Sequence, residues 1–237
     1  ASDVNPQDVP EQVNRNAPSN PTGPPIARHD VWIAKRTGIQ RQIAQDRVPQ
    51  ARLYKVWNVP PYGTPEANLL DLVSDVLASG KNSRLYKRLV YDDQIATDVS
   101  ATMDASEIAG QFMITATAKP GGDLVKVEKA IEEELAKFLA QGPTPRELQR
   151  VKTQFEAGFI RSLERIGGFG GKSDLLARDS VFMDDPGYYL VHLKEGREAS
   201  ARQLQDTAKK WLSDGQYVLS VVPFPKYTSS AEDVDRS

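Results

Sequence analysis

Apolar residues recur with two different spacings along this chain, and the order in which the two spacings alternate limits its fold more than any single motif. Short segments in which every second residue is apolar indicate strands. The first two such segments flank Thr37-Gly38 and are predicted to form a hairpin, and the last, QYVLSVVPF, is apolar enough to lie inside a sheet. Strands are predicted at residues 28–36, 39–47, 51–59, 95–104, 110–118 and 216–224.

Longer segments with apolar residues three and four positions apart indicate helices, and two of them begin with clear start signals. Thr64-Pro65 places a hydroxyl at the N-cap and a proline at the first helical position. Thr144 and Glu147 form the T-x-x-E pattern of a capping box around a proline. Helices are predicted from Thr64 to Gly80, within residues 79–93, from Asp123, from Thr144, and at 172–182, 186–195 and 200–212.

This order of elements predicts the fold class. Long helices that return to a largely antiparallel sheet are typical of an α+β fold rather than a doubly wound one. We therefore expect a two-layer sandwich, with a mainly antiparallel sheet and helices packed on one face. The first 28 residues contain six prolines and cannot build a core. The predicted organisation is a proline-rich linker or end of a preceding domain at 1–27, one domain at 28–225, and a polar tail or linker at 226–237.

Charge and composition exclude several classes of protein. Lys and Arg number 30 against 32 Asp and Glu, which is a poor match to a dedicated nucleic-acid binder. The absence of cysteine excludes disulfides, thiolate catalysis and cysteine-ligated metals, and it leaves the compartment open. No apolar run is long enough to predict a membrane span. The N-terminal sequence ASDVNPQDVPEQ does not look like a signal peptide, although a removed one remains possible.

Few residues could supply a metal site or an acid–base pair. His29 follows the proline-rich leader and is expected to be solvated, whereas His192 lies within YYLVHLKEG and is expected to be a structural histidine of an amphipathic helix. Neither has the spacing of a metal motif. The run Glu132 to Glu134 is typical of a solvated helix face with at most one side chain turned inward. We therefore predict no catalytic and no metal-binding residue in this chain.

The glycine-rich stretch IGGFGGKSD (166–174) invites comparison with a phosphate-binding loop. Ile166 stands where the Walker pattern requires its first glycine, and the stretch follows a helix rather than a strand. We interpret it as a break between two helices that permits close approach by another backbone, such as an adjoining domain or an extended peptide.

The stretch SGKNSRLYKRLVYDD (79–93) carries the densest group of positive charges. Its cations lie away from Leu85 and Leu89, and Tyr86 could stack on a base. Asp92 and Asp93 follow at once, which favours a solvated helix face over a nucleic-acid contact. The four cations are Lys81, Arg84, Lys87 and Arg88.

Several segments together resemble the C-terminal domains of pitrilysin/insulinase-type zinc metallopeptidases, relatives of mitochondrial processing peptidase. The resemblance rests on the order of SGKNSRLYKRLVYDDQIATDV, GGDLVKVEKAIEEELAKFLAQGPTPRELQRVKTQF, GGFGGKSDLLARDSVFMDDPGYY and YVLSVVPFP, and it covers nearly all of residues 28–225. SDVNPQDV resembles the last strand segment of the preceding domain in such proteins. Because this chain has no H-x-x-E-H motif, it resembles a metal-free domain of a longer peptidase.

The resemblance implies a function and a set of partners. Such domains form part of the wall of a chamber that takes in peptides. They lie next to a zinc-bearing domain in the same chain or in a partner subunit. Zinc is then expected in the preceding domain and not here. The glycine-rich segment is similar to that of exported bacterial members, which implies a periplasmic or secreted parent protein. The alternatives are a free-standing inactive subunit that scaffolds a catalytic partner and, more remotely, a nucleic-acid-binding module.

The resemblance also implies where a substrate clamp would lie. Some metal-free domains of this family supply an arginine and a tyrosine that hold substrate, and Val90 and Thr97 occupy those two positions here. A valine cannot donate the charge-assisted hydrogen bonds of an arginine. Arg84 and Tyr91 have the same interval but lie out of frame, which we interpret as coincidence. The substrate-binding residues are therefore unknown from the sequence.

Overall fold

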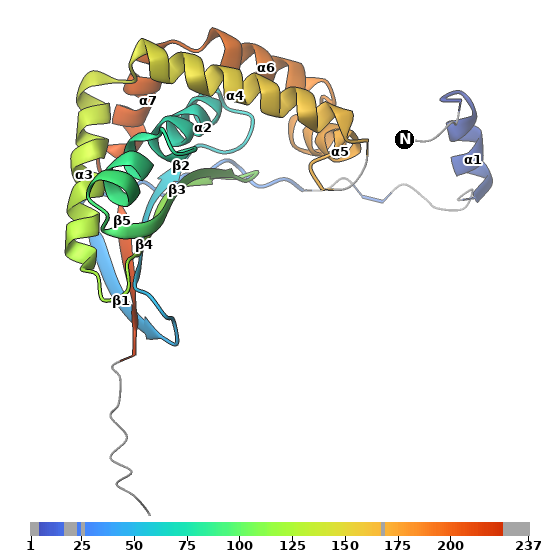
Figure 1. Ribbon diagram of the computed structural model, residues 1–237. Coiled ribbons are helices and arrows are strands. Elements are labelled where there is room, and N and C mark those ends of the chain that lie inside the picture. The colour runs from blue at the N-terminus through green and yellow to red at the C-terminus, as the bar shows by residue number, and fades with distance from the viewer. Residues whose placement is uncertain (1–4, 17–22, 25–26, 167–168, 225–237) are drawn as a thin grey trace, which may run out of the picture.

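One open five-stranded sheet forms the centre of the molecule (Figure 1). The computed structural model describes residues 5–16, 23–24, 27–166 and 169–224. The strand order is β1-β5-β2-β4-β3, in which β1 and β5 run parallel and every other neighbouring pair is antiparallel. The strands are β1 (Gln40–Asp46), β2 (Arg52–Val59), β3 (Ala96–Ala105), β4 (Gly110–Ala118) and β5 (Tyr217–Pro223).

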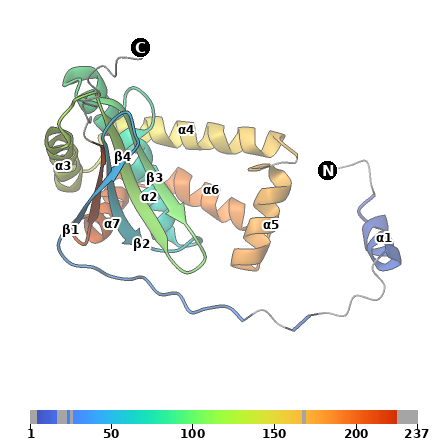
Figure 2. The same cartoon turned by 90° about the horizontal axis from the view of Figure 1, so that it is seen from below.

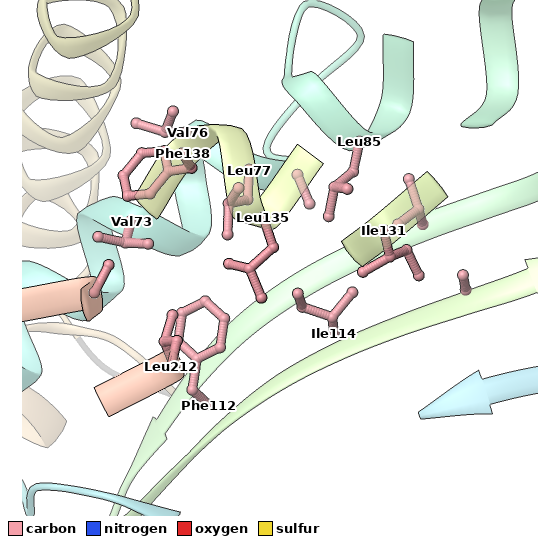
Figure 3. Close-up of a cluster of buried hydrophobic side chains, with 14 of the residues drawn as sticks. Val73, Val76, Leu77, Leu85, Phe112, Ile114, Ile131, Leu135, Phe138 and Leu212 are labelled. Carbon is pink, nitrogen blue, oxygen red and sulfur yellow. The ribbon is translucent and has the colours of Figure 1, made fainter. Parts of the chain in front are cut away.

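Helices cover one face of this sheet and enclose the core. The covering elements are α2 (Pro65–Ala78), η1 (Tyr86–Asp92), α3 (Leu124–Gln141) and α7 (Ala201–Leu212). Figure 3 shows how side chains of α2, α3, α7 and β4 meet in the layer between helices and sheet. Phe112, Ile114, Ile131 and Phe138 are fully buried there, and each such side chain stabilises the fold by about 1.5 to 3 kcal/mol. The α+β sandwich predicted from the sequence is thus confirmed.

Three further helices extend beyond the sheet, with α5 farthest from it (Figure 2). They are α4 (Pro145–Glu164), α5 (Lys172–Met183) and α6 (Tyr188–Glu198), which we call the helical lobe. The Thr144 capping box is present, because its hydroxyl accepts from the Glu147 amide and the Glu147 carboxylate accepts from the Thr144 amide. The Thr64 N-cap is also present. Both predicted helix starts are therefore confirmed.

The predicted hairpin at the start of the domain is wrong. Residues 28–36 form no strand, and Val31 and Trp32 are largely exposed. The apolar residues here form a continuous run from Val31 to Ala34, which does not by itself require a strand partner. β1 instead pairs in parallel with β5, from Gln40 opposite Tyr217 to Asp46 opposite Pro223. Because the second edge of β5 is not taken by β2, β5 supplies the hydrogen-bond partners of β1, whereas the sequence pattern had favoured the neighbouring segment 28–36.

The N-terminal segment also differs from its expected form. The resemblance implied a strand segment within SDVNPQDV, but the described residues begin a turn at Pro6 and continue into α1 (Asp8–Asn16), which has no buried residue. The first four residues and the predicted tail at 226–237 lie outside the described residues. The other predicted strands and helices occur close to their predicted positions.

Candidate functional site

Arg84 of the basic stretch is occupied by a structural ion pair. Its guanidinium makes two hydrogen bonds to the Glu147 carboxylate, at 2.7 and 2.8 Å, and a third to the Gly142 carbonyl at 2.9 Å. It also lies 5.2 Å from the centre of the Phe138 ring. Burial alone would raise the pKa of Glu147, but the hydrogen bonds from Arg84 and Thr144 outweigh it and lower the pKa to about 2. Arg84 thus joins the segment before η1 to the turn between α3 and α4.

Arg88 is occupied in a similar way. Its guanidinium donates to Asp93 at 2.5 Å and to Glu133 at 3.0 Å, and Glu134 lies 3.6 Å away. Lys81 and Lys87 make no ion pair within the described residues. Two of the four cations therefore hold the helix in place, which disfavours both a nucleic-acid grip and a substrate grip.

The glutamate run on α3 is also engaged in ion pairs within the domain. Glu132 pairs with Lys55 at 2.9 Å, and Glu134 pairs with Lys137 as well as approaching Arg88. All three carboxylates of the run thus have cationic partners, and Glu134 is the most buried of them. The expectation of a solvated face holds for Glu132 and Glu133 only in part, because their side chains remain a little under half exposed.

The two positions of the family's substrate clamp have structural surroundings of their own. Val90 lies half-buried in η1 against the hydrophobic core. Thr97 lies at a bulge in β3, where its hydroxyl donates to the Thr117 carbonyl at 3.3 Å. Arg84 is held by Glu147, whereas Tyr91 is 73% exposed. Neither pair offers a free cation next to a phenol, and the substrate-binding residues of this chain stay undetermined.

The described residues do not fit a zinc site. His29 is exposed, and His192 lies in α6, stacked edge-on against Phe155 with ring centres 5.2 Å apart. Among the residues that the structure describes, no group of three or more His, Asp or Glu side chains could hold a metal ion.

A buried lysine inside β2 is a feature that sequence reasoning missed. Lys55 is 0% exposed, and its ammonium pairs with Glu132 and, at 3.3 Å, with Glu128. Arg41 of β1 pairs with the same Glu128 at 2.8 Å. Burial alone would raise the pKa of Glu128, but Arg41 and Lys55 together lower it. A charged residue on the apolar face of LYKVWNV was the signal that could have revealed this network.

The face of the sheet opposite α2, α3 and α7 is not covered by a helix in the described structure (Figure 1). The strand register aligns two rows of side chains across it, all half-buried except the exposed Thr102. Its centre is partly apolar and its β3 side is polar. One row reads Leu219, Tyr54, Thr115 and Ser100, and the next reads Tyr217, Val56, Met113 and Thr102. A flexible polar ligand or the surface of another protein can bind against such a face.

A cleft of about 560 Å³ opens between α2 and the helical lobe. Polar and charged side chains from four helices line it together with two aromatic rings of α4. We call it the interhelix cleft. Its residues include Asp75 of α2, Phe155, Gly158, Phe159 and Arg161 of α4, Arg178 of α5 and His192 of α6.

Buried polar groups lie at the base of the lobe. Asp179 is fully buried, and its Oδ1 accepts from the Tyr62 hydroxyl at 2.6 Å, whereas Oδ2 has no partner in the described structure. Burial and the hydrogen bond to Asp179 raise the pKa of Tyr62. Burial and the charge of Arg178 lower the pKa of His192, whose Nε2 also lacks a partner there. These groups connect the lobe to the loop before α2.

Gly158 lies in the interior of α4, and a Cβ added to it would meet no atom within 4 Å. We expect Gly158→Ala to raise the free energy of unfolding of this chain by about 0.5 to 1 kcal/mol, because alanine restricts the unfolded chain and favours the helix. Urea unfolding measures this. The matched control is Gly196→Ala on α6, which should destabilise because its Cβ would lie 2.3 Å from the Phe155 ring. A loss of stability in Gly158→Ala would contradict the open space beside α4.

Asp71 of α2 makes no ion pair within the described residues, and burial and the nearby Asp75 raise its pKa to about 6. Its folded pKa therefore exceeds the ordinary value of 3.8. The charged Asp71 carboxylate therefore lowers the free energy of unfolding by its full amount above pH 6, and this destabilisation disappears as the pH falls below 4. We expect Asp71→Asn to raise the free energy of unfolding by about 1 to 2 kcal/mol at pH 7 and to lose this advantage by pH 4.

Unfolding curves from pH 4 to pH 8 test this expectation. Asp206→Asn is the control, because Asp206 pairs only with exposed Arg202 one helical turn away and should change stability by less than about 0.5 kcal/mol. An Asp71→Asn gain that is constant across this pH range would show that the charge of Asp71 is not its source.

The glycine-rich stretch connects two helices, as predicted from the sequence. α4 ends at Glu164 and α5 begins at Lys172. Residues 167–168 lie outside the described residues.

Comparison with known proteins identifies the family. The family model described as "Peptidase M16 inactive domain" matches residues 1–155. No protein with a curated function matches the sequence significantly. None of the helices in the described part of the chain is long and apolar enough to cross a membrane.

Solved structures share the fold. A protease from Helicobacter pylori is 22% identical over 93% of this chain and 54% of its own, with a TM-score of 0.81. The inactive peptidase domain of a candidate zinc protease from Bordetella parapertussis is 19% identical over 79% and 98% of the two chains (TM-score 0.68). The periplasmic protease PqqL from Escherichia coli is 14% identical over 94% and 24% (TM-score 0.71). The chain thus spans about half the length of the Helicobacter protease.

Proposed function

Since this chain belongs to the peptidase M16 inactive-domain family, we propose that it is a non-catalytic domain of a bacterial zinc metallopeptidase and forms part of the wall of a peptide-enclosing chamber. The zinc-bearing domain against which it packs is not present in this chain. The proposed domain occupies residues 28–225, between a linker at 1–27 and a tail at 226–237.

The observation that carries this proposal is the uncovered sheet face. Helices cover the other face, yet the centre of the uncovered one holds half-buried Tyr54, Val56 and Leu219. A partly apolar sheet face of this kind is suited to line a shared cavity, where peptide substrates would contact it without any catalytic group from this chain. Val90 and Thr97 supply no cation, which supports a wall rather than a substrate clamp.

Zinc belongs to the proposed partner domain. The described residues here offer no ligand set for it, and a neighbouring structure is described as part of a candidate zinc protease. The name of the E. coli neighbour supports a periplasmic parent protein. The parent protein would then be a zinc endopeptidase that acts on peptides, whereas this domain would bind no nucleic acid.

The proposal predicts that the purified, chelator-washed chain binds no stoichiometric zinc and cleaves no peptide. The longer protein encoded by the complete reading frame should contain an H-x-x-E-H domain, bind one zinc and cleave peptides. Metal analysis by mass spectrometry and a fluorogenic peptide mixture measure both. Tight zinc binding by the chain alone would contradict the proposal.

The same experiment separates the alternative. A reading frame that starts near Ala1 and encodes no histidine-bearing domain would favour a free-standing inactive subunit that scaffolds a catalytic partner. The nucleic-acid alternative requires binding that weakens with salt and with loss of Lys81 and Lys87. The ion pairs of Arg84 and Arg88 disfavour it.

A further inference from the structure

We infer that the interhelix cleft and the helical lobe around it are the docking surface for the zinc-bearing domain that precedes this one in the parent protein. This inference rests on the proposed function and adds the place at which the two domains meet. It names a different surface from the uncovered sheet face, which is left free for peptides.

The lobe exposes several large apolar side chains. α4, α5, α6 and the connection between α4 and α5 present seven of them to solvent. No helix or strand of the described chain covers these side chains. They are Ile160, Ile166, Phe169, Val181, Phe182, Leu190 and Val191. Exposed apolar residues gathered on one part of a molecule are typical of an interaction site.

The cleft itself has the properties of a surface with a missing neighbour. Gly158 lies inside α4 although a Cβ would meet no atom there. A glycine at this position costs helix stability, and it leaves room for another backbone to approach closely. The buried Nε2 of His192 has no partner in the described structure. A segment of another domain could supply the close contact at Gly158, whereas the Nε2 atom of His192 is enclosed by this domain and is not accessible to it.

The point at which the chain enters this domain indicates that the preceding domain is the partner that docks here. Arg28 pairs with Glu107 in the β3–β4 turn and with Asp184 just after α5, both at 3.3 Å. The chain therefore enters the domain beside the C-terminal end of α5. In both views α1 lies at the same end of the molecule as α5 (Figures 1 and 2).

The length of a related structure indicates the size of the docking domain. The part of the Helicobacter protease that has no counterpart in this chain is about as long as the part that matches it. A preceding domain of that size, tethered at Arg28, can reach the lobe without a long linker.

The absence of cysteine from this chain allows a direct test by thiol labelling. Arg161→Cys places a probe in the cleft, at an exposed side chain with no hydrogen-bond or ion-pair partner in the described structure. Val125→Cys is the matched control on α3, where the side chain is 73% exposed. Thr102→Cys reports on the uncovered sheet face. Maleimide labelling rates are measured by peptide mass spectrometry in this chain and in the protein encoded by the complete reading frame.

We expect all three probes to react at similar rates in this chain. In the longer protein Arg161→Cys should label at least tenfold more slowly, whereas Val125→Cys should be unchanged. Protection of Thr102→Cys instead of Arg161→Cys would overturn the docking surface and leave the proposed function standing. Slow labelling of Arg161→Cys already in this chain, and dependent on its concentration, would assign the lobe to a second copy and overturn the inference.

Two other outcomes also decide the question. Equal labelling of all probes in the longer protein would overturn the inference, because no domain would cover the cleft. A reading frame without an upstream H-x-x-E-H domain would remove the proposed function and this inference together.

Discussion

Lys55→Ala should lower the free energy of unfolding by about 3 kcal/mol. The substitution removes a fully buried side chain and leaves Glu128 and Glu132 without the ammonium that lies between them. Loss of one partner from a buried ion pair commonly costs about 3 to 5 kcal/mol, and we expect the lower end because Glu132 is 44% exposed and Glu128 keeps Arg41. Urea unfolding at pH 7, followed by circular dichroism, measures the change.

Two variants show whether charge or volume is responsible. Lys55→Met keeps most of the buried stem, so its deficit reports mainly on the two carboxylates that lose their cation. Lys137→Ala removes an exposed lysine that pairs with Glu134 on the same helix, and it should change stability by less than about 0.5 kcal/mol. A Lys55→Ala loss no larger than that of Lys137→Ala would mean that the network linking β1, β2 and α3 contributes little.

The helices were predictable from the sequence because their signals are local. Thr64, Asp123, Thr144 and Ser200 each accept a hydrogen bond from an amide two or three residues later. Such a bond needs only its own turn of chain, so it can be read before the rest of the fold is known.

Strand partners were not predictable in the same way. Residues 28–36 contain a continuous apolar run from Val31 to Ala34, and residues 39–47 contain only scattered apolar residues, yet only the second segment joins the sheet. Its partner β5 is the last strand of the chain. Pairing between distant segments depends on which sheet edge remains free after the core has packed, and no local pattern records this.

The candidate site shows the same division. The lack of a metal motif was visible in the sequence, because cysteine is absent and neither His29 nor His192 has the spacing of such a motif. The role of the basic stretch was not, because the partners of Arg84 and Arg88 lie on α4 and α3. The interhelix cleft was also invisible, since α2, α4, α5 and α6 each contribute only a few of its residues.

Arg84 provides the second large expected effect. Arg84→Ala should lower the free energy of unfolding at pH 7 by about 2 to 4 kcal/mol. It leaves the partly buried Glu147 carboxylate without its cation and the Gly142 carbonyl without its donor, and it removes the contact with Phe138. Arg84→Lys should recover only part of this loss, because an ammonium cannot make the two parallel hydrogen bonds of a guanidinium. Arg202→Ala, at an exposed position on α7, is the control.

The pH dependence distinguishes the ion pair from simple packing. The folded pKa of Glu147 is about 2 against an ordinary value of 4.5, so its stabilising contribution is present above pH 4.5 and is lost as the pH falls toward 2. Without Arg84, burial should raise that pKa again and remove this contribution. The difference between wild type and Arg84→Ala should therefore shrink between pH 5 and pH 2 in urea unfolding. A difference that stays constant over this range would assign the role of Arg84 to its packing on Phe138, and the basic stretch would then be held by shape rather than by charge.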